Sequence, residues 1–140
     1  MRYLLDTCVL IYAIDDREKL NSAIDDILFD YNNQIYVSAE SIKELIVLYR
    51  HKHMFNKRWK TEKEMVKSIT DDYCFQIRPV TEQVLLTYAD LRPNEQEDHK
   101  DPSDHVIISH AMSERMPLIS SDRKFVYYLP QGLNLVFNER

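Results

Sequence analysis

The sequence predicts an α/β fold, a three-layer α/β/α sandwich with a mainly parallel sheet of about five strands. Short apolar runs alternate along the chain with longer segments in which apolar residues recur at helical spacing. Such alternation implies parallel β-α-β units with right-handed crossovers. No internal repeat, low-complexity segment or linker interrupts the chain, so we expect a single domain over residues 1–140.

The first half of the chain begins with an apolar run that predicts a strand over residues 2–6. A short, mostly apolar helix is expected over 9–13. Apolar residues at helical spacing then predict an amphipathic helix over 20–31, and the apolar run 35–37 predicts a second strand. Another helix is expected over 42–49, where apolar residues recur at i, i+3, i+4 and i+7.

The second half begins with a basic and aromatic segment, 50–67, in which we expect helix to continue or restart. The run 74–77 predicts a third strand. Thr81 is a suitable N-cap for the next helix, and Asp101, which precedes a proline, is a suitable N-cap for the one after it. The last two strands are predicted at 118–119 and 133–137.

Composition is that of an ordinary globular protein, with 44% hydrophobic and 29% charged residues. No apolar stretch approaches the roughly 20 residues that span a bilayer, and the chain begins with strand-like residues instead of a signal-peptide pattern. We therefore expect a cytoplasmic protein. Its two cysteines, Cys8 and Cys74, are expected to be buried free thiols, and they are too few and too far apart for a zinc site.

Glycine and charge exclude several function classes. Gly132 is the only glycine, so the chain cannot build the glycine-rich loop of P-loop or dinucleotide-binding enzymes. The net charge of −5 means that any basic surface for nucleic acid must be local. An acidic balance also suits a protein that binds a basic partner.

Acidic residues stand where short strands end or helices begin. Asp6 closes the first predicted strand, Asp122 follows the fourth, and Asp104 lies at the start of a predicted helix. Ligands of open α/β sheets bind beyond the carboxyl ends of the strands, and carboxylates gathered there repel one another unless a cation neutralises them. Mg²⁺ is the natural partner of such oxygen ligands. The pattern therefore predicts a metal-dependent phosphoryl-transfer enzyme.

Each of these residues also has a purely structural interpretation. A lone aspartate after a strand often caps a helix, which applies to Asp6 and most strongly to Asp101. Glu44 lies off the apolar face of its predicted helix, which favours a solvated glutamate, and Glu40 is an alternative candidate one turn earlier. Asp122 is a residue type that commonly begins a turn.

One basic and aromatic cluster is a candidate for contacting nucleic acid. It comprises Lys57, Arg58, Trp59 and Lys60. Such a cluster can hold phosphates and stack a base, but it is equally typical of a solvated helical face. The histidines show no metal-ligand spacing and are expected at the surface or in loops, with His105 as the one that approaches substrate.

Taken together, these residues resemble the PIN domain family, and most of all the VapC-type toxins of toxin–antitoxin pairs. The resemblance spans nearly the whole chain, and it rests on four short motifs in the expected order. These are Leu4-Leu5-Asp6-Thr7, Ser38-Ala39-Glu40-Ser41-Ile42-Lys43-Glu44-Leu45, Asp101-Pro102-Ser103-Asp104 and Leu118-Ile119-Ser120-Ser121-Asp122-Arg123-Lys124-Phe125.

The resemblance implies an endoribonuclease that depends on Mg²⁺ or Mn²⁺, held by Asp6, Glu44, Asp104 and Asp122. Its alignment selects Glu44 over Glu40. It further implies an RNA substrate, a homodimer and a small antitoxin that blocks the acidic pocket. Thr7 and Ser120 are expected to hydrogen-bond either a carboxylate or the scissile phosphate.

Two departures from the family pattern, at Cys8 and His105, leave every carboxylate in place. Three alternatives remain open. A phosphatase of the haloacid-dehalogenase type also begins with an aspartate at a strand end, but it needs a second aspartate where Cys8 stands. An RNA-processing PIN nuclease that is not a toxin, and a non-catalytic PIN-like module that binds RNA or protein, share the same motifs.

Overall fold

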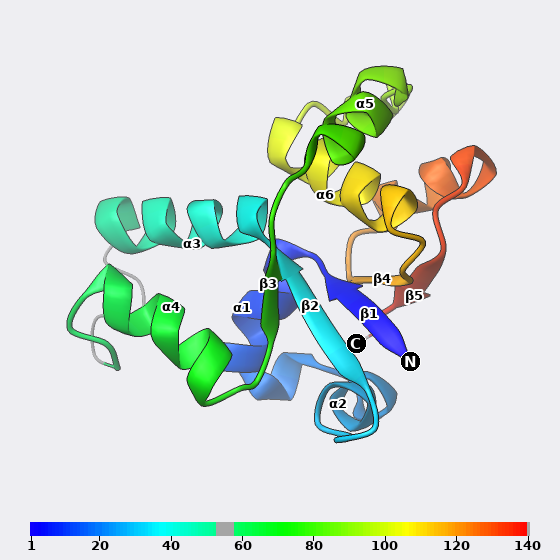
Figure 1. Cartoon of the computed structure of the whole chain (residues 1–140). Helices are drawn as coiled ribbons and strands as arrows, with labels where there is room; N and C mark the ends of the chain where they lie inside the picture. The colour runs from blue at the N-terminus through cyan, green and yellow to red at the C-terminus, as the bar shows by residue number, and fades with distance from the viewer. Residues whose placement is uncertain (53–57, 140) are drawn as a thin grey trace.

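The computed structural model describes residues 1–52 and 58–139. Its centre is a five-stranded, entirely parallel sheet (Figure 1). The strands lie in the order β3-β2-β1-β4-β5. Their bounds are β1 (Arg2–Leu5), β2 (Gln34–Ser38), β3 (Gln76–Arg78), β4 (Leu118–Ser120) and β5 (Leu135–Phe137). The predicted α/β/α fold with a parallel sheet is confirmed.

The strand order creates one switch point. From β1 the chain proceeds outward through β2 to β3, then returns to the other side of β1 for β4 and β5. Leu4 of β1 is accordingly in register with Tyr36 of β2 on one side and with Leu118 of β4 on the other. Helical connections leave β1 and β4 on opposite sides of such a point, which opens a crevice at their carboxyl ends.

The helices alternate with the strands, as predicted. They are α1 (Thr7–Asp15), α2 (Ser22–Leu28), α3 (Ala39–Lys52), α4 (Glu62–Asp71), α5 (Glu82–Asp90) and α6 (Pro102–Ser113), with the 3₁₀ segments η1 (Arg17–Lys19) and η2 (Arg123–Gln131). Thr81 caps α5 through Val84 N–H, and Asp101 caps α6, which confirms both predicted caps. Within the described residues, no helix is long and apolar enough to cross a membrane.

Successive side chains of the strands pack alternately into two separate hydrophobic cores. Tyr3 and Leu5 of β1 pack into a core with α1, α2, α3 and α4, whereas Leu4 between them packs into a core with α6 and η2. Successive residues of a strand point to opposite faces of the sheet. Both faces of the sheet are thus covered by helices, which explains why successive apolar residues of β1 are all buried.

One sequence-based expectation about local structure was wrong. Cys8 and Cys74 are exposed free thiols rather than buried ones. Helix restarts at Glu62, within the segment where we expected it, and the Trp59 side chain is buried in the core. The nine-residue 3₁₀ helix η2 had no counterpart among the elements predicted from the sequence. It ends at Gly132, whose φ of 114° is in the range that favours glycine.

Candidate functional site

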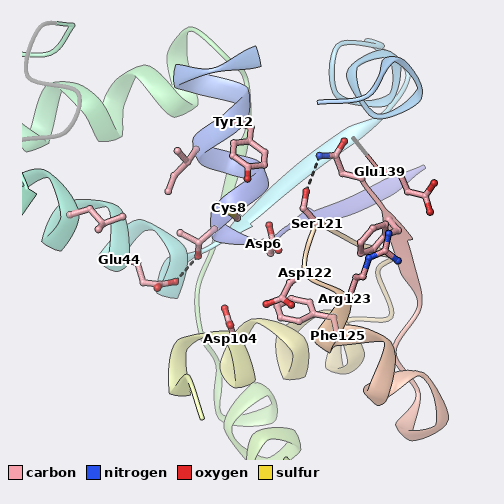
Figure 2. Close-up of a pocket in the computed structure, with 15 residues that line it drawn as sticks. Asp6, Cys8, Tyr12, Glu44, Asp104, Ser121, Asp122, Arg123, Phe125 and Glu139 are labelled. Carbon is pink, nitrogen blue, oxygen red and sulfur yellow. Dashed lines mark hydrogen bonds between the residues drawn. The ribbon is translucent and has the colours of Figure 1, made fainter. Parts of the chain in front are cut away.

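Four carboxylates meet on one cavity of about 830 Å³ at the switch point of the sheet. Figure 2 shows how they converge: Asp6 follows β1, Asp122 follows β4, Glu44 comes from α3 and Asp104 from α6. The strands place Asp6 and Asp122 side by side because β1 and β4 are adjacent and parallel. The helices bring Glu44 and Asp104 in from the two layers that flank the sheet.

Asp6 is the most buried of the four, with 3% of its surface exposed. Its Oδ1 accepts from Val9 N–H at 2.8 Å and so caps α1, while its Oδ2 accepts from the Ser120 hydroxyl at 2.5 Å. Burial, together with the negative charges of Asp104 and Asp122, raises the pKa of Asp6 to about 7. The two hydrogen bonds act in the opposite direction and lower this pKa. Asp6 therefore caps α1, and the surrounding hydrogen-bond donors compensate its negative charge only in part.

Glu44 is oriented by a hydroxyl from the neighbouring element. Thr7 Oγ1 donates to Glu44 Oε1 at 2.5 Å and lies 3.0 Å from the Ser41 hydroxyl. Burial raises the pKa of Glu44 despite this bond, and nearby carboxylates add to the effect. Glu40 instead pairs with Lys43 at 2.7 Å and is not part of the cavity lining.

Asp104 contacts a histidine that the sequence-based interpretation had placed at the surface or in a loop. His99 is 4% exposed, and its Nε2 lies 3.0 Å from Asp104 Oδ2. Burial raises the pKa of Asp104, and the neighbouring charge of Asp101 raises it further although the bond to His99 lowers it. Asp101 itself serves as the helix cap, with Oδ1 accepting from Ser103 N–H at 2.9 Å.

Asp122 and Asp6 are linked through one hydroxyl. The backbone N–H of Asp122 donates to Ser120 Oγ at 3.0 Å, and the same oxygen donates its hydrogen to Asp6. The Asp122 side chain accepts from Lys124 N–H at 2.9 Å, which caps η2. Ser120 therefore fixes the relative position of two carboxylates that lie far apart in sequence.

Thr7 and Ser120 were expected to hydrogen-bond either a carboxylate or the scissile phosphate. Ser120 is fully buried and Thr7 is 8% exposed. Both hydroxyls are hydrogen-bonded to carboxylates of the site. Of the two roles that the sequence left open for them, the structure places both residues in the carboxylate-binding one.

The basic cluster does not line the cavity in the described part of the chain. Lys57 lies outside the described residues. Trp59 is 6% exposed and packs in the core, so its ring is not available for a base to stack on, which corrects that interpretation. The Arg58 guanidinium donates to the Ile14 carbonyl and lies 4.6 Å from the Trp59 ring. Lys60 is exposed and remains a candidate phosphate contact.

The expectation that the histidines lie at the surface or in loops was wrong for His105 and His110, which are buried in α6, whereas His99 lies in the loop before α6 but is buried. His99, His105 and His110 are 4%, 6% and 0% exposed. His110 belongs to a separate network, with Nδ1 2.9 Å from Ser38 Oγ and Nε2 2.5 Å from Glu114 Oε2. Nothing in the sequence indicated the contact between His99 and Asp104 beyond the place of His99 five residues before Asp104.

The donor set of the cavity fits a hard divalent cation. Four carboxylates supply oxygen ligands, which Mg²⁺ and Mn²⁺ prefer. The raised pKa values of Asp6, Glu44 and Asp104 reflect charge that a cation would compensate. Polar atoms of Asp104, Asp122 and the neighbouring His99 also lie within 4.8 Å of one another.

We expect added Mn²⁺ to raise the melting temperature of the protein. A ligand that binds only the folded state stabilises it by about 2.7 kcal/mol at a hundredfold excess over Kd. Asp104→Asn should lose most of this shift because it removes a charge from the cavity. Asp101→Ala should keep the shift while lowering stability by about 1 kcal/mol, the usual cost of a lost cap. Thermal unfolding with and without Mn²⁺ measures both variants, and equal shifts in the two would contradict the assignment.

Comparison with known proteins gives a family and a fold. The model of the PIN domain family matches residues 3–128. No curated protein matches the chain at a significant level. Among solved structures, VapBC2 from Rickettsia felis bound to a DNA fragment from its promoter has a similar chain, with a TM-score of 0.72, 21% identity, and 99% of this chain and 100% of that one covered.

Two further structures show the same fold. VapBC-1 from nontypeable Haemophilus influenzae aligns with a TM-score of 0.67 and 22% identity over 98% of each chain. VapBC-5 from Mycobacterium tuberculosis, a member of the VapBC family of toxin–antitoxin systems, aligns with a TM-score of 0.65 and 20% identity, covering 99% of this chain and 98% of that one. At these identities the likeness establishes the arrangement of the backbone.

Proposed function

This chain belongs to the PIN domain family, and we propose that it is a metal-dependent endoribonuclease and the toxin of a toxin–antitoxin pair. The observation that carries the proposal is the meeting of Asp6, Glu44, Asp104 and Asp122 on one cavity at the switch point of the sheet. Two helices and two strand ends contribute to that arrangement. Helix capping explains Asp6 and Asp122 individually, but it gives no reason for the four to converge.

The residues of the chain prepare the site before any ligand arrives. Ser120 and Val9 hold Asp6 in one rotamer, and Thr7 holds Glu44. These two carboxylates are thereby oriented before the reaction and need not reorganise during it. Preorganised polar groups stabilise a transition state better than water does because they avoid this reorganisation. An opening to solvent along the cavity leaves room for a phosphodiester backbone to approach.

A divalent cation bound by these carboxylates supplies Lewis-acid chemistry, lowering the pKa of water and neutralising charge that develops on the phosphate. Asp6, Glu44 and Asp104 would hold it, with Asp122 completing the set. Arg123 lines the same cavity and is suited to contact a phosphate oxygen, since a guanidinium matches phosphate geometry.

The proposed partner is a cognate antitoxin, and the proposed assembly contains a homodimer of this chain. Similar folds occur in VapBC2, VapBC-1 and VapBC-5, and the last of these is a member of a toxin–antitoxin family. A cavity lined by five acidic side chains, the four carboxylates and Glu139, is electrostatically complementary to a basic side chain. These two observations support an antitoxin that places a lysine or arginine in the cavity.

Cleavage of RNA by the purified protein, with Mn²⁺ or with EDTA, tests the proposed activity. We expect cleavage only with the metal, and products that carry 5′-phosphate and 3′-hydroxyl ends, because an activated water rather than the ribose 2′-hydroxyl is the nucleophile. Products with 2′,3′-cyclic phosphate ends, or full activity in EDTA, would refute the mechanism. Absence of any cleavage alongside tight RNA binding would favour the non-catalytic module.

Expression in growing cells tests the toxin role separately. We expect growth to stop when the wild-type chain is produced, and to continue when the Asp6→Asn variant is produced at the same level. Active enzyme that leaves growth unaffected would favour the RNA-processing nuclease instead.

A further inference from the structure

His99 lies behind Asp104 in a closed polar network on the side of the acidic cavity formed by α6 and η2. Its ring is 4% exposed, and each of its two nitrogens has one partner. Nε2 lies 3.0 Å from Asp104 Oδ2, and Nδ1 lies 2.9 Å from the Tyr128 hydroxyl. The Tyr128 oxygen in turn accepts from the backbone N–H of Asn94 at 3.0 Å.

The contacts favour one placement of the hydrogens. An ionised carboxylate only accepts hydrogen bonds, so the nitrogen facing Asp104 must carry a hydrogen. Nδ1 is then the acceptor, and the Tyr128 O–H donates to it. The Tyr128 oxygen keeps a lone pair for the Asn94 N–H, so every donor has one acceptor. The opposite tautomer would set the Nε2 lone pair against a carboxylate oxygen.

Aromatic rings hold the imidazole in place. His105 packs edge-on against His99 at 4.8 Å between centroids, and Phe125 lies at 5.6 Å and Tyr128 at 5.7 Å. Phe125 and Tyr128 are themselves 1% and 0% exposed. The ring of His99 therefore has one orientation, and that orientation is passed on to Asp104.

We propose that His99 is a positioning residue: it donates from Nε2 to Asp104 Oδ2, in the tautomer that Tyr128 and Asn94 impose, and leaves Asp104 Oδ1 to ligate the cation. The inference rests on the proposed metal-dependent function, because it assigns His99 a task within that site. It also distinguishes His99 from a metal ligand. A ligating nitrogen needs its lone pair, and the network has already placed a hydrogen on the nitrogen that faces the cavity residues.

Two substitutions separate the hydrogen bond from the packing. His99→Phe keeps a ring within the aromatic surroundings and removes the donor. His99→Gln puts an amide donor near the position of Nε2. Partners that orient a metal ligand typically contribute about 10- to 100-fold to metal affinity, so we expect His99→Phe to weaken Mn²⁺ binding by that factor in calorimetry. His99→Gln should recover most of it.

His110→Gln is the matched control. His110 is equally buried and also contacts a carboxylate, Glu114, but that carboxylate is not part of the cavity lining. This variant should lower the melting temperature and leave the Mn²⁺ affinity unchanged. Tyr128→Phe provides a second route to the same answer, since it keeps His99 and removes only the group that selects its tautomer. It should weaken Mn²⁺ binding by less than His99→Phe does.

Nitrogen-15 NMR of the imidazole reads the tautomer directly, because protonated and unprotonated ring nitrogens differ widely in shift. We expect a hydrogen on Nε2 and none on Nδ1 in the metal-free protein, unchanged when diamagnetic Mg²⁺ is added. Loss of the Nε2 hydrogen with Mg²⁺ would make His99 a ligand and overturn the proposal. So would a hydrogen on Nδ1, or wild-type Mn²⁺ affinity in His99→Phe. Failure of the wild-type protein to bind Mn²⁺ would instead refute the proposed function.

Discussion

Asp6→Asn is expected to lower the rate of RNA cleavage by about a thousandfold or more, since a lost metal ligand removes several kcal/mol of stabilisation and each 1.36 kcal/mol corresponds to a factor of ten. Asp6 lies at the centre of the site, between Ser120 and the charges of Asp104 and Asp122. Asparagine is nearly the same size and retains one acceptor for the cap of α1. The fold should therefore survive, and circular dichroism will verify it.

The same variant should be more stable than the wild type at alkaline pH when metal is absent. The pKa of Asp6 is about 7 in the folded state against an ordinary value of 3.8, so the folded protein binds this proton more tightly than the unfolded chain. The stability contributed by the protonated carboxyl is complete below a pH of about 4 and is lost as the pH rises through 7. Asp6→Asn has no such charge to bury.

Thermal unfolding at pH 5 and pH 8 in EDTA measures this effect. The wild type should lose more stability than Asp6→Asn between the two pH values, by up to a few kcal/mol, since one pKa unit corresponds to about 1.4 kcal/mol. Asp15→Asn, at the exposed end of the same helix, is the control. It should follow the wild type in both cleavage and pH dependence. Identical pH profiles for the wild type and Asp6→Asn would show that Asp6 is compensated in some other way.

The second large effect is expected for Glu44→Gln, with Glu40→Gln as its matched control. Glu44 lines the cavity and accepts from Thr7, whereas Glu40 pairs with the exposed Lys43 on the same helix. Glu44→Gln should abolish cleavage and remove most of the stabilisation by Mn²⁺, because an amide is a weaker and uncharged ligand. Glu40→Gln should leave both unchanged and cost less than about 1 kcal/mol of stability, as exposed ion pairs do.

Cleavage rates and melting temperatures with and without Mn²⁺, measured for both variants, decide between the two glutamates. Loss of activity in Glu40→Gln with retention in Glu44→Gln would move the site by one helical turn. In that case the cavity at the switch point would not be where the chemistry occurs.

Several features of the fold were predictable because they are local. Apolar runs and helical spacing identified the alternation of strands and helices, and the N-caps Thr81 and Asp101 were recognisable from residue type and position. Placement of Asp6 and Asp122 followed from the same local logic. Each stands just after a strand, and the ends of parallel strands meet at one edge of the sheet.

Features that depend on long-range packing were not predictable. Ser120 and Asp6 are 114 residues apart, so no spacing rule in the sequence indicates that the Ser120 hydroxyl donates to the Asp6 carboxylate. Trp59 looked like part of an exposed basic face, yet burying a large aromatic ring in the core is favourable enough to outweigh that local pattern. The 3₁₀ segment η2 is held by Phe125 and Tyr128, both buried, rather than by any helical periodicity.

The sequence by itself thus predicted the order of the elements and the positions of Asp6 and Asp122, because both follow from periodicity and from residue type at strand ends. The choice of Glu44 over Glu40 came from the family resemblance. Only the tertiary structure decided which strands are neighbours, how the carboxylates converge on one cavity, and that His99 is buried against Asp104. These outcomes depend on packing between elements far apart in the chain. A histidine in a polar loop carries no local sign of its partner until the core formed by α6 and η2 encloses it.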